Sequence, residues 1–125
     1  MKKILMFLFC ITTLLVFTSC FQSKAISIVK DGHFTYYDEM TVGEAVDGFF
    51  GNPKWKSYVP ADKELSDFML VNVEGKILYD DEKADAIIQF IVDEDTGEFE
   101  LYAFEIDGVP QNDYMIVSLI EAMFE

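Results

Sequence analysis

Asp93, Asp95 and Glu100 come closest, by type and spacing, to a set of metal ligands. With Gly97 they form a D-x-D-x-G pattern on an expected turn, and oxygen ligands of this kind suit a hard cation such as Ca²⁺. A full EF-hand also needs an acid at the twelfth loop position and a helix on each side, but that position is Phe104 and the flanks alternate like strands. We therefore expect a solvated hairpin loop, with a small ligand or Ca²⁺ as the alternative.

Catalysis would depend on a single histidine, His33, which follows Gly32 near the start of the expected domain. No Gly-x-Ser-x-Gly segment supplies a nucleophile to go with it. One histidine also falls short of an ordinary zinc ligand set. Carboxylate pairs such as Asp38-Glu39 carry little information in a chain with 23 Asp and Glu residues. We therefore expect a protein that is not an enzyme, and we predict no cofactor.

Two helices are predicted from their first residues. Thr41-Val42-Gly43-Glu44 matches a capping box and predicts a helix over about 42–50. Asn112 or Asp113 can cap a second helix over about 113–124. In both segments the apolar residues recur at helical spacing, so each helix has one face to bury.

The remaining segments are typical of strands, and 51% hydrophobic residues suffice for one small core. Gly75-Lys76 turns the chain or forms a bulge. Short connections favour antiparallel pairing. We predict one α+β domain over 26–125, with a four- to five-stranded, largely antiparallel sheet and two helices on one face. The expected strands cover 26–29, 55–59, 65–73, 84–92 and 98–106.

The chain begins with the features of a bacterial export signal. Lys2 and Lys3 precede an apolar run over 4–18, which is shorter than the roughly 20 residues that a membrane-spanning helix needs. The following Phe17-Thr18-Ser19-Cys20 resembles the lipobox of bacterial lipoprotein signal peptides, with Phe17 in place of the usual leucine. The resemblance implies cleavage of 1–19, lipid on Cys20 and a short tether over 20–25. An ordinary secretory signal is the alternative.

The charge balance limits the possible partners. The chain has 23 acidic and 9 basic residues, all of the basic ones lysine, and a net charge of −14. Removal of 1–19 takes away two lysines and no acid, so the mature chain carries −16. Such a surface repels a phosphate backbone and attracts cationic partners. We expect no nucleic-acid binding, and name a basic envelope protein or peptide as the candidate partner.

A longer segment resembles uncharacterised small bacterial lipoproteins. Residues 41–55 match their pattern T-[VI]-G-x-A-[FV]-x-x-F-F-x-N-P-x-W, and parts of 88–92, 97–100 and 109–112 resemble their later segments. The resemblance implies a location in the cell envelope and an α+β domain, and it brings no activity. Because Phe21 and not aspartate follows Cys20, lipoprotein sorting implies the outer membrane in a host with two membranes, and otherwise the outer face of the cell membrane.

Aromatic residues close to this pattern have two interpretations. Phe49, Phe50 and Trp55 are expected to pack the first helix on the sheet, since each large ring can bury 150–250 Å². Alternatively, Phe49, Phe50, Trp55 and Tyr58 contribute to a groove that binds a partner. The sequence therefore predicts a lipid-anchored envelope protein that acts in binding or assembly.

The lipid anchor gives the first testable prediction. Mass spectrometry of the native protein should find an N-terminus at Cys20 that carries lipid, because hydrophobic chains on this residue hold the protein at the membrane. A Cys20→Ala variant should leave the membrane fraction, whereas Cys10→Ala should stay in it. A native chain that begins at Met1, or that has an unmodified thiol at position 20, would contradict the prediction.

Overall fold

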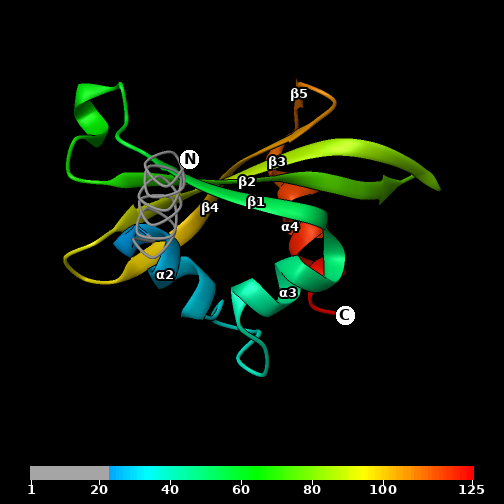
Figure 1. Cartoon of the computed structure of the whole chain (residues 1–125), viewed down its shortest axis with the longest axis horizontal. Coiled ribbons are helices and arrows are strands. Elements are labelled where there is room, and N and C mark those ends of the chain that lie inside the picture. Colours follow the sequence, from blue (N-terminus) through cyan, green and yellow to red (C-terminus); the bar gives the residue numbers. More distant parts are fainter. Residues whose placement is uncertain (1–22) are drawn as a thin grey trace, which may run out of the picture.

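A computed structural model describes residues 23–125 and contains a five-stranded antiparallel sheet in the order β1-β2-β3-β4-β5. The three α-helices of this part of the chain all lie on one side of the sheet (Figure 1). The α+β class and the antiparallel sheet are confirmed. The predicted signal peptide 1–19 and Cys20 lie outside the described residues. The elements are α2 (Lys24–Asp31), α3 (Val42–Phe49), β1 (Gly51–Tyr58), the short 3₁₀ helix η1 (Lys63–Leu65), β2 (Met69–Tyr79), β3 (Glu82–Asp93), β4 (Glu98–Ile106), β5 (Val109–Pro110) and α4 (Asp113–Met123).

The core lies between the helices and one face of the sheet. Every second residue of β3, from Ala84 to Val92, is buried, and Phe90 is fully inaccessible to solvent. Opposite residues of β2, such as Val71 and Val73, are buried on the same face. The alternation follows from the two-residue period of a strand, which sends successive side chains to opposite faces.

A helix replaces the first predicted strand. Residues 26–29 belong to α2, which begins at Lys24, so its first turn also takes up the end of the predicted tether 20–25. The Ser23 hydroxyl accepts a hydrogen bond from the backbone N–H of Ala25, at 3.1 Å, and caps the helix. Ala25, Ile26 and Val29 fall on one helical face and are buried against the sheet. The prediction of a strand was wrong because burial of this face outweighs the weak strand preference of the β-branched residues.

Gly75 does not turn the chain. The strand β2 runs through Gly75 and Lys76, and the irregularity lies on the neighbouring strand, between Gly51 and Lys54. A Cβ atom at Gly75 would lie 3.1 Å from the Phe50 ring and 3.0 Å from the Gly51 carbonyl oxygen. The glycine therefore allows Phe50 to pack directly on the sheet. The two predicted helices are confirmed as α3 and α4, each within a residue of its expected bounds.

No helix within residues 23–125 is long and apolar enough to span a membrane.

The turn between β2 and β3 has an unfavourable backbone conformation. Asp80 and Asp81, which join Tyr79 to Glu82, have φ angles of 53° and 64°. Both values belong to the left-handed region, where a Cβ atom is crowded and glycine is preferred. The projecting tip of this hairpin is thus closed by two aspartates in a conformation that their short side chains tolerate but that glycine adopts at a lower energy.

Replacement of Asp81 by glycine should therefore stabilise the protein. We expect Asp81→Gly to raise the free energy of unfolding by about 0.5–1 kcal/mol, as measured by urea denaturation. Asp95→Gly is the matched control, since Asp95 lies in the next hairpin loop without a positive φ. This control should lower stability slightly through the greater freedom of glycine in the unfolded chain. A loss of stability in Asp81→Gly would contradict the prediction.

Candidate functional site

The loop between α2 and α3 forms, with Phe124, a small hollow that combines aromatic rings and carboxylates. Its volume is about 180 Å³. The Tyr36 side chain is 90% exposed, and Asp38 and Glu39 are exposed beside it. We call this feature the loop hollow, and its lining residues are Tyr36, Tyr37, Asp38, Glu39, Met40 and Phe124.

Stacked rings attach the loop hollow to the core. The Tyr37 and Phe124 rings are stacked, with their centroids 4.9 Å apart, and Phe34 meets the Phe124 ring edge-on at 5.6 Å. The Phe34 ring also lies 6.3 Å from that of Phe90, the central residue of the core. The backbone N–H of Tyr37 donates to the Phe34 carbonyl oxygen at 3.0 Å. The floor of the hollow is therefore held by aromatic packing, while Tyr36 stays in solvent.

The far end of the loop is closed by the predicted capping box. The Thr41 hydroxyl accepts a hydrogen bond from the Glu44 backbone N–H at 3.1 Å, and the Glu44 carboxylate accepts one from the Thr41 backbone N–H at 3.2 Å. The Thr41 hydroxyl also donates to the Glu44 carboxylate, at 3.0 Å. The bond from the Thr41 backbone N–H and, after it, this hydroxyl bond lower the pKa of Glu44 below its ordinary value, with a smaller contribution from His33. The Val42 N–H also donates to the Gly32 carbonyl oxygen, at 2.9 Å, so both ends of the loop are tied together.

The chemistry of the loop hollow suits a cationic group. Aromatic faces attract ammonium and guanidinium groups, and carboxylates add charge-assisted hydrogen bonds. Asp38 and Glu39 form no ion pair with any other residue of the described range 23–125. Their charges are therefore available to a lysine or arginine side chain from outside.

The aromatic residues that the sequence singled out lie elsewhere. Phe50 is buried in the core and Phe49 meets its ring edge-on at 5.8 Å, so both pack α3 onto the sheet. Trp55 is partly buried, and its ring already has the Lys30 ammonium 5.1 Å from its centroid. Tyr58 is 41% exposed on the opposite side of the sheet. The structure therefore does not gather these four residues into one groove.

The predicted calcium ligands are likewise not gathered into a cation site. The Asp93 carboxylate accepts hydrogen bonds from the backbone N–H groups of Asp95 and Thr96, at 2.9 and 3.3 Å, and so caps the hairpin loop. Glu100 lies on β4, opposite Ile91. Across residues 23–125, no three side chains of His, Cys, Asp or Glu are close enough to hold a metal ion. Calcium binding stays a prediction without support from the geometry.

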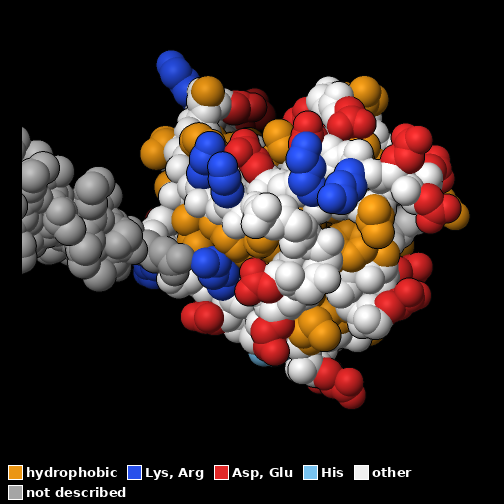
Figure 2. All heavy atoms as spheres, turned by 45° about the vertical axis from the view of Figure 1, so that its right-hand side comes forward, with side chains coloured by type: hydrophobic (Ala, Val, Ile, Leu, Met, Phe, Trp, Pro, Cys, Tyr) orange, Lys and Arg blue, Asp and Glu red, His pale blue; other side chains and the backbone are white. Residues whose placement is uncertain are grey.

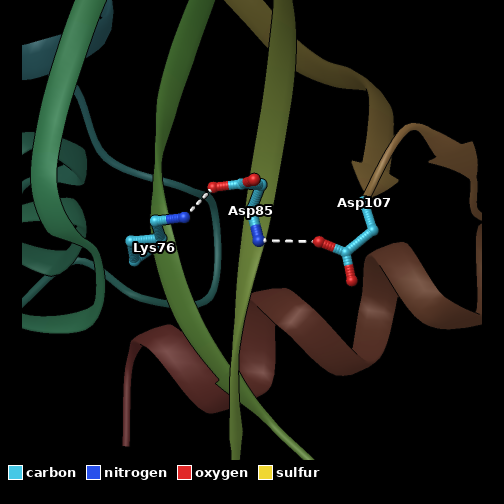
Figure 3. Close-up of polar contacts among 3 residues, drawn as sticks. All are labelled: Lys76, Asp85 and Asp107. Carbon is cyan, nitrogen blue, oxygen red and sulfur yellow. Dashed lines mark hydrogen bonds and ion pairs between the residues drawn. The ribbon is translucent and has the colours of Figure 1, made fainter.

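The face of the sheet away from the helices is not covered by another element of the described chain. Its strands β1 to β4 carry charged side chains around half-buried Leu70, Ile87 and Ile91. Figure 3 shows part of it, where the Lys76 ammonium bonds to the Asp85 carboxylate. The Asp85 backbone N–H in turn donates to the Asp107 carboxylate at 3.0 Å. We call this surface the open face.

Sequence reasoning missed the loop hollow. The run Tyr36-Tyr37-Asp38-Glu39 combines two rings with two acids, and this composition was the available signal. The sequence does not show that Phe124, at the other end of the chain, forms the stacking partner of Tyr37. The hollow therefore depends on a contact between the two ends of the domain.

Comparisons with protein-family models, with characterised proteins and with solved structures found no match to this chain. The resemblance of residues 41–55 to small bacterial lipoproteins thus stays a prediction.

The lowered pKa of Glu44 predicts an acid-sensitive contribution to stability. Because its folded-state pKa is lower than its unfolded value, the charged form stabilises the fold above the unfolded pKa. This stabilisation is lost as the pH falls through the lower folded-state value. Urea denaturation of the wild type and of Glu44→Gln, whose amide can still accept the bond from Thr41, should differ most near about pH 6 and least near about pH 3. A difference that does not change with pH would contradict this account.

Proposed function

We propose that this chain is a lipid-anchored, non-catalytic binding or assembly module of the bacterial cell envelope whose partner is a cationic protein or peptide. The observation that carries the proposal is the loop hollow, in which exposed Tyr36 lies beside the unpaired carboxylates of Asp38 and Glu39. Lysine and arginine side chains have the chemistry that this combination recognises. The lipid anchor rests on the sequence motif at Cys20.

The charge around the hollow supports the same partner class. Outside the open face, residues 23–125 contain seventeen acidic residues but only three of the seven lysines, namely Lys24, Lys30 and Lys63. No charged side chain in this range is buried, so each charged group is in contact with water. A surface of this sign raises the association rate of a cationic partner, and short-range contacts at the hollow would then give selectivity.

A defined cationic probe tests the proposal. The mature chain in detergent micelles is titrated with a fluorescent oligolysine peptide, and binding is followed by anisotropy. The triple variant Tyr36→Ala, Asp38→Asn, Glu39→Gln should weaken binding about tenfold, since it removes one ring and two charges from the contact. Binding by the wild type should also fall steeply at about 0.5 M salt, where charges more than a few ångströms apart are screened.

The β2–β3 hairpin tip provides a matched control. The triple variant Tyr79→Ala, Asp80→Asn, Asp81→Asn also removes one exposed tyrosine and two acids, and so changes the net charge equally. It should keep most of the affinity for the peptide. Equal losses in both variants would show attraction by net charge without a site, and wild-type binding that is insensitive to salt would refute the electrostatic basis of the proposal.

A further inference from the structure

The lysines of this acidic chain are concentrated on the open face. Lys54, Lys56, Lys76 and Lys83 all have register positions there, together with six acids: Glu74, Asp85, Asp93, Glu98, Glu100 and Glu105. The open face therefore carries a net charge of −2, and the rest of residues 23–125 carries −14. The side view in Figure 2 shows several lysines gathered in the upper half of the molecule and many acids toward its right-hand and lower margins. Like-charge repulsion between two copies is thus weakest at the open face.

The charges on this face are also divided between its two edges. Lys54 and Lys56 lie on β1, at one edge, whereas Glu98, Glu100 and Glu105 lie on β4, three strands away. Leu70 on β2 and Ile91 on β3 are direct neighbours in the middle. The face is therefore basic at β1, partly apolar at its centre and acidic at β4. Such a surface is complementary to a second copy of itself that is rotated by 180° about an axis along the strands.

We propose that the open face joins two copies of this chain, related by a twofold axis that runs parallel to the strands between β2 and β3. A rotation about this axis places β1 of one copy over β4 of the other, and β2 over β3. The pairings follow from the register, because residues directly opposite on neighbouring strands share one row. At the edges Lys54 faces Glu105, and the interior pairs are Leu70 with Ile91, Asn72 with Gln89, Glu74 with Ile87, and Lys76 with Asp85.

Four of these five pairs are chemically matched, and Glu74, which would face Ile87, keeps its ion pair with Lys56, 3.4 Å away in the same chain. Lys54 and Glu105 have no ion-pair partner within residues 23–125, so a second copy would supply one to each. Leu70 and Ile91 are only half-buried in the single chain, and a facing sheet would remove them from water. Gln89 donates to Asn72 at 2.9 Å within the chain. Both side-chain amides have further donors and acceptors that can bond to the same pair of residues in the facing copy.

The size of the open face is adequate for this role. Four strands spaced about 4.8 Å apart, and about eight residues along each at roughly 3.3 Å, give a projected area of the order of 500 Å². The accessible area of a surface with projecting side chains is larger, which brings it near the roughly 800 Å² per partner of a standard interface. Two sheets that pack face to face lie about 10 Å apart, and strands in near alignment keep these pairs opposite one another.

Charge reversal at the edge pair tests the proposal without touching the loop hollow. Sedimentation equilibrium of the mature chain in density-matched detergent should show a monomer–dimer equilibrium. Lys54→Glu alone and Glu105→Lys alone should each weaken dimerisation about tenfold or more, since each places like charges together at two symmetric contacts. Both variants keep the lipid anchor, so two chains that merely occupy the same micelle would be equally frequent in the variants and the wild type. A difference between them therefore reports dimerisation.

A mixture of the two variants gives the decisive measurement. When one chain carries Lys54→Glu and the other Glu105→Lys, both edge contacts again join opposite charges, and dimers should form as in the wild type. A wild-type chain that stays monomeric, single variants that dimerise as well as the wild type, or a mixture that is not restored would each overturn the proposal. None of these results would bear on oligolysine binding at the loop hollow, so the two proposals can fail separately.

Discussion

Burial of only one face of the sheet is the constraint on which the rest of this structure depends. The alternate residues of β2, β3 and β4 that include Val73, Phe90 and Phe104 meet the apolar faces of α2, α3 and α4. Few other arrangements could remove these side chains from water in so short a chain. All three α-helices pack on this side (Figure 1). The opposite side carries charged and half-buried residues.

The same constraint positions both proposed binding surfaces. The connection between α2 and α3 must cross the edge of the core, and Phe34 holds it there through the rings of Phe90 and Phe124. Tyr37 then stacks on Phe124, and the following acids are left in solvent at the rim of the helical layer. The open face arises because the α-helices of the described residues pack on only one face of the sheet. The strongly acidic surface and the nearly neutral one thus lie on different sides of a single core.

Secondary structure could be predicted where local sequence signals agree with the contacts made in the folded chain. The capping box at Thr41 and Glu44 identified α3, and alternation identified β3 and β4, because in these segments short-range hydrogen bonding and burial favour the same structure. In α2 they disagree, since Ile26 and Val29 favour a strand locally but pack as one face of a helix. Trp55 and Phe50 were recognised as large hydrophobic residues. Their unequal burial depends on Lys30 and Gly75, which lie far from them in the sequence.

The sequence by itself determined the α+β class, the antiparallel pairing, the acidic charge and the motif around Cys20, because these depend on composition, short spacing or strand period. Only the tertiary structure decided which acids remain unpaired, which rings remain exposed and which lysines share a surface. The physical reason is that these properties are set by contacts between distant segments, as between Tyr37 and Phe124, and by strand register, as between Lys54 and Glu74. A periodic pattern assigns a side chain to a face of its own strand, but it does not say which strand lies beside it.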